Sequence, residues 1–331
     1  MARPTTRETL HYPALVDSLP DQTGKVVLVT GCTSGMGLVL ARTAAEKGAR
    51  VVMLNRPSER ADRALAELKA ISADAMLIPC DLTSFASVRA AGAELRDAFL
   101  DHGVDVLVNN AGLMGLPEQG TADGFEIQMQ ANHLSHFLLT HEIWPLLETA
   151  SAQRGEARVV NHSSGARNKP KRPVMREIYE PDPTRWGGDR WPGMGKWVRY
   201  SQSKLANLLF TYALQEHAGA RPGNKVKALC AHPGPADSGL QAKTSRAGKT
   251  TILDRYILSS TVKIAQSQED GTCGLARAAF DPDAKGGDFF GPDAEKRVGP
   301  ALRLPPERDP AGEAILWEAS LKATGIDSFF A

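Results

Sequence analysis

The sequence lacks the features of several large classes of protein. No apolar run approaches the length of about 18 residues expected for a membrane span. Residues 1–23 are polar and contain three prolines, which fits neither a signal peptide nor a membrane anchor. Because 39 basic side chains balance 38 acidic ones, the net charge is only +1. No overall field therefore points to nucleic acid or to an acidic membrane as a partner.

Cysteine is scarce as well. Of the four cysteines, Cys32, Cys80 and Cys230 lie in or at the ends of predicted strands, where a free cysteine behaves as a small core residue. No two of the four, which include Cys273, form a C-x-x-C pair. This usage favours a reducing, intracellular environment, and we expect a cytoplasmic protein.

Three histidines, His133, His136 and His141, share one predicted helix. Their spacings of three and five residues, without a glutamate partner, do not match the metal motif H-E-x-x-H. Core or surface positions explain these histidines better. We therefore predict no metal site.

What the chain does have is a regular alternation of apolar segments. Its 331 residues are enough for one large α/β domain or two small ones. From residue 25 on, apolar β-branched runs alternate with segments of helical periodicity, such as Val88, Ala91, Leu95 and Phe99. Such runs suit a parallel sheet buried on both faces, so we predict an α/β fold with a doubly wound, mainly parallel seven-stranded sheet and helices on both faces. The predicted strands are 25–30, 50–55, 75–80, 104–110, 158–163, 225–232 and 288–291.

Two long stretches interrupt the alternation. Residues 166–198 are rich in Pro, Gly, Arg and Trp, and residues 235–265 follow a His-Pro-Gly turn. Long irregular segments in a compact domain are usually functional loops or disordered. Both stretches follow strand ends, where open α/β sheets bind ligands. We interpret them as substrate loops and a lid, with a flexible basic insertion as the alternative for the first.

A glycine-rich segment follows the first predicted strand. Residues 26–30 lead directly into Gly31-Cys-Thr-Ser-Gly-Met-Gly37, where a helix begins. Glycines allow a tight turn and close approach of a ligand, and the free N–H groups of a helix N-terminus favour a pyrophosphate. The spacing G-x-x-x-G-x-G differs from G-x-G-x-x-G and from the P-loop. A glycine turn without a ligand is the alternative.

The end of the second predicted strand indicates which dinucleotide would bind. An NAD site commonly has Asp or Glu there for the ribose hydroxyls, whereas an arginine accommodates a 2′-phosphate. The sequence has Asn55 and Arg56 at this point and no acid. Since a planar guanidinium suits bidentate contact with phosphate, we predict that NADP(H) is preferred over NAD(H). Arg60 or Arg42 could serve instead of Arg56.

A tyrosine and a lysine lie four residues apart in a long predicted helix, 199–217. Residues at this spacing share a helix face, so Tyr200 and Lys204 project side by side. A neighbouring positive charge lowers the pKa of a phenol from its usual value of about 10, which makes the tyrosine a plausible general acid or base. The pair alone is weak evidence, since most such pairs are surface contacts.

Seven motifs follow one another along the chain: Thr30-Gly-x-x-x-Gly-x-Gly37, Asp81-Leu82, Asn109-Asn-Ala-Gly112, Asn132, Asn161-His-Ser-Ser164, Tyr200-x-x-x-Lys204 and His232-Pro-Gly234. In this order they resemble the short-chain dehydrogenase/reductase family, and more closely its retinol-dehydrogenase-like and protochlorophyllide-reductase-like branch. The resemblance covers nearly the whole chain from residue 24 on. It implies an N-terminal arm at 1–23 and a single Rossmann-type catalytic domain at 24–331, with insertions at 166–198 and 235–265.

The resemblance implies a catalytic set of Asn132, Ser164, Tyr200 and Lys204. By the family pattern Ser164 is the catalytic serine, with Ser163 as the alternative. Asn132 is a mediocre helix former in mid-helix. It would hold a water linked to the lysine, although a polar hydrogen bond in the core would also explain it.

The serine and the tyrosine of this set are further apart than in compact family members. Ser164 and Tyr200 are separated by 36 positions, because the insertion at 166–198 lies between them. The retinol-dehydrogenase-like branch carries a comparable insertion. We therefore expect substrate to meet its tryptophans, unless these only pack. They are Trp186, Trp191 and Trp197.

The same resemblance implies cofactor contacts along the strand ends. Asp81 would contact the adenine, with a helix N-cap as another role. The small residues at 109–112 would let the backbone approach the nicotinamide ribose. The predicted cofactor-binding residues are Gly31, Thr33, Ser34, Gly35, Met36, Gly37, Asn55, Arg56, Asp81, Leu82, Asn109, Ala111, Gly112, Tyr200, Lys204, Pro233 and Gly234.

Together these features predict an NADP(H)-dependent oxidoreductase, a ketoreductase that transfers hydride between the nicotinamide and a carbonyl or secondary alcohol of an apolar or polycyclic substrate. Tyr200 would protonate the developing alkoxide, and Ser164 would hydrogen-bond it. Lys204 would lower the pKa of the tyrosine while holding the ribose, and both residues are among the predicted cofactor contacts. Two alternatives stay open: a reductase of an activated C=C bond, and a non-catalytic NADP(H)-binding regulator. The expected partner is a small molecule, and a homodimer or homotetramer is left open.

Overall fold

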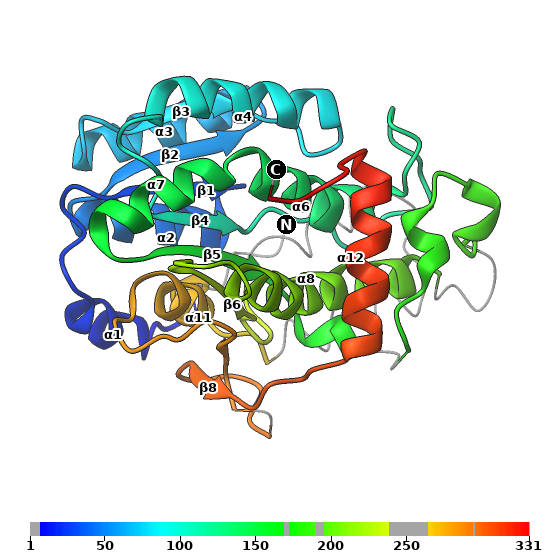
Figure 1. Ribbon diagram of the computed structural model, residues 1–331. Coiled ribbons are helices and arrows are strands. Elements are labelled where there is room, and N and C mark those ends of the chain that lie inside the picture. Colours follow the sequence, from blue (N-terminus) through cyan, green and yellow to red (C-terminus); the bar gives the residue numbers. More distant parts are fainter. Residues whose placement is uncertain (1–6, 169–171, 190–194, 238–263, 294, 331) are drawn as a thin grey trace.

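An eight-stranded sheet runs between two layers of helices (Figure 1). The computed structural model describes residues 7–168, 172–189, 195–237, 264–293 and 295–330. In this part of the chain the strand order is β3-β2-β1-β4-β5-β6-β7-β8, with β1 to β7 parallel and β8 antiparallel. The strands are β1 (Val26–Thr30), β2 (Arg50–Asn55), β3 (Met76–Pro79), β4 (Val106–Asn109), β5 (Ala157–His162), β6 (Val226–Ala231), β7 (Phe289–Gly291) and β8 (Leu302–Leu304).

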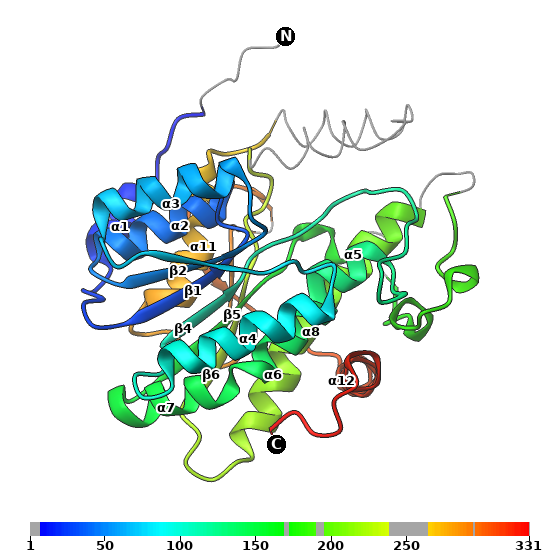
Figure 2. The same ribbon diagram turned by 90° about the horizontal axis from the view of Figure 1, so that it is seen from above.

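Helices cover both faces of the sheet, as the view from above shows (Figure 2). On one face lie α1, α2, α3 and α11, and on the other α4, α6, α7 and α8, with α12 packed on α8 from outside. The doubly wound α/β prediction is thereby confirmed. The helices are α1 (Tyr12–Ser18), α2 (Gly35–Glu46), α3 (Glu59–Ile71), α4 (Phe85–Phe99), α5 (Ile127–Met129), the π-helix η1 (Gln130–Leu134), α6 (Ser135–Glu142), α7 (Trp144–Arg154), the 3-10 helices η2 (Gly165–Asn168), η3 (Arg176–Tyr179) and η4 (Pro183–Arg185), α8 (Gly195–Gly219), α11 (Gln268–Phe280) and α12 (Pro310–Thr324).

The predicted number of strands was too low by one. All seven predicted strands are present within a few residues of their expected bounds, but β8 adds an eighth. It pairs antiparallel with β7 at the edge of the sheet, and Leu302 and Arg303 are exposed. A strand of three residues with exposed side chains has neither an apolar run nor an alternation that the sequence could reveal.

The central strands are buried on both faces, as their composition predicts. Every residue of β1 is buried, and β1 pairs with β2 on one side and β4 on the other. The apolar stripe predicted at Val88, Ala91, Leu95 and Phe99 is the buried side of α4. Parallel strands sandwiched by helices in this way bring all their carboxyl ends to one edge.

Residues 10–12 of the N-terminal arm are hydrogen-bonded to the first turn of α11. The carboxylate of Asp270 accepts hydrogen bonds from the backbone N–H groups of Leu10 (2.9 Å), His11 (2.8 Å) and Tyr12 (2.9 Å). The hydroxyls of Tyr12 and Thr43 are 2.7 Å apart, which joins α1 to α2. The arm thus holds the first turn of α11 at the carboxyl edge of the sheet.

The second predicted insertion begins and ends at one point of that edge. Ala236 and Gln266 form an isolated parallel bridge, with Asp237 N donating to Gln266 O and Gln266 N donating to Pro235 O, both at 3.0 Å. The residues between, 238–263, lie outside the described part of the chain. The first insertion is described except for 169–171 and 190–194, and it contains η2, η3 and η4.

The helix predicted at 199–217 is α8, which extends over 25 residues. Most of its side chains are buried, and they include polar ones such as Ser203, Asn207 and Thr211. Across the described ranges we find no helix with the length and apolar character needed to cross a membrane.

Candidate active site

A cavity of about 1570 Å³ lies at the carboxyl ends of the parallel strands. Its wall runs from the turn after β1, past the ends of β2, β3 and β4, to α8 and the turn after β6. In the strand order β1 lies beside β4, and the chain winds away from these two strands in opposite directions. Doubly wound sheets bind their ligands at such a switch point.

Most of the residues predicted from the sequence line this cavity. Of the four predicted catalytic residues, Ser164, Tyr200 and Lys204 line it and Asn132 does not. Of the predicted cofactor-binding residues, Asn109 is absent from the wall. The others on the wall are Gly31, Thr33, Ser34, Gly35, Met36, Gly37, Asn55, Arg56, Asp81, Leu82, Ala111, Gly112, Pro233 and Gly234.

The glycine-rich turn has the geometry of a phosphate cradle. Gly31 has φ = 69°, and a Cβ there would lie 2.8 Å from the Cα of Ala111, so a side chain would both strain the turn and clash. A Cβ on Gly37 would lie 2.4 Å from the amide nitrogen of Asn110. Ser34 begins α2 in an extended conformation without a side-chain cap. The N–H groups of the first turn are therefore left for an anionic ligand, and a pyrophosphate fits this site.

The three candidate arginines for a 2′-phosphate differ in their surroundings. Arg56 and Arg60 are exposed and line the cavity just beyond β2. Arg42 does not line it and forms an ion pair with Glu67. Arg56 and Arg60 are therefore both placed to contact a 2′-phosphate, with Arg56 directly after β2, whereas Arg42 is held by Glu67 away from the cavity.

Asp81 stands at the end of β3 and shapes the turn that follows. Its Oδ1 accepts hydrogen bonds from the backbone N–H (2.9 Å) and the hydroxyl (2.8 Å) of Thr83. The N-cap of α4 is Ser84, whose hydroxyl accepts from Ser87 N at 3.3 Å. The alternative role of Asp81 as the cap is thus wrong, and its carboxylate lines the cavity.

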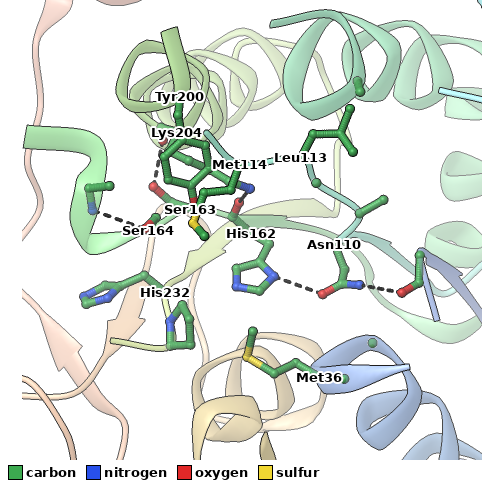
Figure 3. A pocket seen from close by; sticks show the side chains of 18 of the residues that line it. Met36, Asn110, Leu113, Met114, His162, Ser163, Ser164, Tyr200, Lys204 and His232 are labelled. Atoms are coloured by element: carbon green, nitrogen blue, oxygen red, sulfur yellow. Dashed lines mark hydrogen bonds between the residues drawn. The ribbon is translucent and has the colours of Figure 1, made fainter. Parts of the chain in front are cut away.

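Tyr200 and Ser164 meet on the wall of the cavity (Figure 3). A side-chain hydrogen bond with Ser164 lowers the pKa of Tyr200, but burial has the larger effect and raises that pKa overall. Ser163 is turned away, since its hydroxyl donates to the backbone oxygen of Lys204 at 2.7 Å. Of the two serines, Ser164 is therefore the one beside the phenol.

Lys204 has a different electrostatic effect from the one predicted. Its Nζ donates to the backbone oxygen of His162 at 2.9 Å, and burial lowers the pKa of the ammonium to about 8. In the ligand-free protein burial thus shifts both pKa values toward the neutral forms, and the pKa of Tyr200 is not lowered below that of a free phenol. The spacing of four residues predicts that Tyr200 and Lys204 are neighbours. It does not predict how far burial shifts their pKa values, because burial depends on the rest of the fold.

Asn132 anchors a loop. Its amide nitrogen donates to Leu113 O (2.9 Å) and Ser203 Oγ (2.8 Å), and its Oδ1 accepts from Leu113 N (2.7 Å). The residue lies within the π-helix η1, where the regular α-helical hydrogen bonding is interrupted. Its backbone oxygen is 2.9 Å from Nδ1 of His136. The side chain of Asn132 therefore makes polar hydrogen bonds in the core, which is one of the two roles expected from the sequence.

Asn109 belongs to the core, and its neighbour Asn110 lines the cavity instead. The amide nitrogen of Asn109 donates to Thr140 Oγ1 at 3.1 Å and to Asn161 Oδ1 at 2.9 Å. Since side chains alternate along a strand, the next residue points to the other face. Asn110 and His162 are two polar residues of the wall that were not predicted as site residues. Both lie inside motifs of the resemblance, 109–112 and 161–164, and both are polar residues at the end of a buried strand.

The tryptophans of the insertion take separate roles. Trp197 lines the cavity and packs edge to face on Tyr200, with ring centroids 6.5 Å apart. Trp186 is buried away from it and donates to Glu180 O at 3.0 Å. Trp191 lies outside the described residues. Of the two tryptophans that the structure describes here, Trp197 is therefore the one placed to contact a substrate.

The histidines of the predicted helix occupy structural positions. His133 is buried, with Nε2 2.8 Å from Ser320 Oγ, and burial lowers its pKa to about 3. His136 is buried between Asn132 O and Thr30 Oγ1. His141 lies 2.8 Å from Phe329 O. Each is thus engaged with the helices or strands around it.

Known proteins with related sequences support the resemblance. The family model described as short chain dehydrogenase matches residues 25–175. Polyprenol dehydrogenase of Mus musculus is 33% identical, over 93% of this chain and 86% of its own. Retinol dehydrogenase 11 of Homo sapiens is 34% identical, over 74% of this chain and 71% of its own. The match to the short chain dehydrogenase/reductase dpchH of Colletotrichum higginsianum, 36% identical over 65% of this chain, spans only 55% of that protein.

Solved structures agree with the fold. An uncharacterized protein from Mycobacterium Paratuberculosis has a TM-score of 0.72 and 32% identity, over 94% of this chain and 97% of its own. L-Sorbose reductase from Gluconobacter frateurii, complexed with NADPH and L-sorbose, has a TM-score of 0.61 over 82% of this chain and 96% of its own. At 20% identity that likeness shows the fold alone. By its sequence relatives and its fold, the chain belongs to the short-chain dehydrogenase/reductase family of oxidoreductases, in the retinol-dehydrogenase-like branch.

Proposed function

We propose that the chain is an NADP(H)-dependent oxidoreductase that transfers hydride between the nicotinamide and a carbonyl or secondary alcohol carbon of an apolar substrate. The observation that carries this proposal is the Tyr200–Ser164 pair of hydroxyls on the wall of the same cavity that holds the glycine-rich turn. A phosphate cradle at one end and a proton donor at the other are what a hydride transfer from a dinucleotide requires.

The residues of the wall have distinct roles in the reductive direction. A nicotinamide cofactor, when bound, would supply the hydride for the carbonyl carbon. Tyr200 donates its phenolic proton to the oxygen as negative charge develops there, and Ser164 donates a hydrogen bond to the same oxygen. The raised pKa of Tyr200 keeps the phenol protonated and ready to donate. Lys204, held by His162 O, stabilises the phenolate that remains.

The apolar part of the cavity wall supports an apolar substrate. Leu113, Met114, Leu116, Trp197 and Leu304 line it, and apolar linings of this kind are typical of small-molecule sites. Two relatives are named for the apolar alcohols polyprenol and retinol. An apolar or polycyclic carbonyl compound therefore fits the chain better than a sugar.

The direct test uses the purified protein, NADPH and a panel of apolar ketones and aldehydes that includes an α,β-unsaturated ketone. We expect oxidation of NADPH and recovery of the alcohol. Recovery of the saturated ketone from the unsaturated one would instead assign a C=C reductase. Binding of NADPH without turnover across the panel would assign a regulator.

Exchange of Arg56 for alanine should weaken NADPH much more than NADH. A charge-assisted hydrogen bond to phosphate contributes about 1.5–3 kcal/mol, and the exposure of Arg56 favours the lower end, so we expect KM for NADPH to rise about tenfold. Steady-state kinetics with both cofactors measure the change. Arg42→Ala is the matched control, because Arg42 is paired with Glu67 away from the cavity. A drop in the NADPH preference of the control alone would move the phosphate site to Arg42.

The pKa of Lys204 predicts the pH dependence of the free enzyme. Since burial lowers this pKa to about 8, the ammonium is present below that pH and is lost above it, whereas the raised pKa of Tyr200 keeps the phenol protonated throughout. For reduction, kcat/KM for NADPH should be flat below pH 8 and then fall about tenfold per pH unit. Any residual activity of Lys204→Arg should lack this fall, because a guanidinium stays charged. A wild-type profile that stays flat to high pH would contradict the assignment.

A further inference from the structure

The imidazole of His162 lies in the middle of the cavity wall, at the end of β5. Its backbone oxygen accepts the ammonium of Lys204 at 2.9 Å, so the residue directly adjoins the proposed hydride-transfer centre. Its side chain lines the cavity and is 6% exposed. Figure 3 shows the ring between Met36 of the phosphate turn and the Tyr200–Lys204 pair. No role for this ring follows from the mechanism above.

The tautomer of His162 is fixed by a chain of hydrogen bonds that starts at the phosphate turn. The amide nitrogen of Asn110 donates to the backbone oxygens of Thr30 (2.8 Å) and Gly31 (3.3 Å). Two carbonyl partners can only accept, so the amide cannot be flipped. The amide oxygen of Asn110 therefore faces Nδ1 of His162, at 2.9 Å, and Nδ1 must carry the proton.

The second ring nitrogen is consequently a hydrogen-bond acceptor. Burial, with the nearby charge of Lys204, holds the pKa of His162 well below its usual value, so the ring is neutral at working pH. A neutral imidazole with a proton on Nδ1 has a lone pair on Nε2. Within the described ranges Nε2 has no hydrogen-bond partner, and the ring lines the cavity. A lone pair on the wall of the cavity fits a ligand that brings an N–H or O–H donor.

The location indicates which part of a dinucleotide brings that donor. A pyrophosphate fits the Gly31–Gly37 turn, and the reacting carbon would lie beside Tyr200. The nicotinamide half would therefore face the wall between them, where His162 lies (Figure 3). Its donors are the ribose hydroxyls and the carboxamide NH2. Lys204 and Tyr200 are the proposed partners of the ribose, which leaves the carboxamide. An amide buried without a partner would cost free energy, and an acceptor here avoids that cost.

We propose that Nε2 of His162 accepts a hydrogen bond from the carboxamide NH2 of the cofactor and so fixes the orientation of the nicotinamide ring. The inference rests on the proposed function, because it needs a nicotinamide cofactor in this cavity. It assigns His162 a role in cofactor recognition, and it makes Asn110 the residue that positions the imidazole.

Binding measurements with a matched pair of ligands test the proposal. NADP+ and its 3-acetylpyridine analogue differ in one group, since the analogue keeps the carbonyl and replaces NH2 with CH3. We expect the wild-type protein to bind NADP+ about fivefold more tightly than the analogue, as the loss of one hydrogen bond predicts. In His162→Leu, which removes the acceptor and keeps an apolar side chain of similar reach, the two ligands should bind equally. Isothermal titration gives both dissociation constants without any turnover.

Two controls separate this role from a general effect on the cavity. Adenosine 2′,5′-bisphosphate lacks the nicotinamide half and should bind the wild type and His162→Leu with the same affinity. His162→Gln places an amide oxygen near the position of Nε2, and we expect it to keep at least a twofold preference for NADP+. An equal weakening of the bisphosphate and NADP+ in His162→Leu would overturn the proposal, since it would reveal a structural role.

The failure of this inference can be told apart from the failure of the proposed function. If the wild type binds neither NADP+ nor the bisphosphate, the proposed function is wrong. If the wild type binds NADP+ and its acetylpyridine analogue equally, or if the preference persists in His162→Leu, the proposed function stands and the role of His162 is refuted.

Discussion

Tyr200→Phe should lower kcat for NADPH-dependent carbonyl reduction by about a thousandfold and leave NADPH binding close to that of the wild type. The phenylalanine ring fills the same space beside Trp197, but it has no proton to give to the developing alkoxide. Positioned general acids contribute about 10²–10⁴-fold to rate. Stopped-flow measurement of single-turnover NADPH oxidation separates this chemical step from binding and product release.

The chain offers a matched control for this exchange. Tyr179 is also buried, and its hydroxyl has no hydrogen-bond partner in the described structure. It lies outside the cavity wall. Tyr179→Phe likewise removes a phenolic hydroxyl from a buried tyrosine. Because this hydroxyl lies away from the cavity, kcat should be unchanged. Turnover in Tyr200→Phe as fast as in this control would remove Tyr200 from the mechanism.

The elements that the sequence predicts well are those whose cause is local. The strands around the switch point are continuous apolar runs, and the turn from Gly31 to Gly37 has glycines at the positions where a side chain would clash. Such features depend on a few neighbouring residues and are visible in any window of the sequence. The strand β8 depends on pairing with β7 alone, which no local pattern records.

The features of the site also separate into those with a local cause and those that depend on the whole fold. Spacing in a helix places Tyr200 and Lys204 together, but the direction of their pKa shifts depends on how deeply the surrounding chain buries them. The fixed tautomer of His162 requires Asn110 and the carbonyls of two further residues, more than a hundred positions away in the sequence. Contacts between residues so far apart in the sequence are created by the fold, and no local sequence pattern predicts them.

Arg199, which directly precedes Tyr200, also owes its role to long-range contacts. Its sequence context does not indicate that role. Its side chain is fully buried. Its Nε lies 3.2 Å from Glu126, Nη2 lies 2.7 Å from Asp189, and Nη1 lies 3.5 Å from Glu118. Nη1 also donates to Gly188 O at 3.1 Å. The guanidinium thus joins α8 to the segment before α5 and to the insertion.

Arg199→Met should lower the free energy of unfolding by about 3–5 kcal/mol, because removal of one partner leaves the other charge buried without compensation. That partner is Glu126, which is fully buried and caps α5 by accepting from Met129 N at 2.8 Å. Urea denaturation at pH 7 measures the loss. Arg176→Met, in the same insertion, breaks only the exposed pair with Glu318 and should cost less than about 1 kcal/mol.

Two further measurements identify the unpaired charge as the cause. The double variant Arg199→Met with Glu126→Gln removes both charges and should recover most of the lost stability. Burial raises the pKa of Glu126 even beside Arg199, and without the arginine the folded protein binds that proton more tightly still. A group whose folded-state pKa is raised favours the folded state as pH falls. The deficit of Arg199→Met should therefore shrink as the pH is lowered. A deficit that is the same at every pH and persists in the double variant would show that lost packing, and not the charge, is responsible.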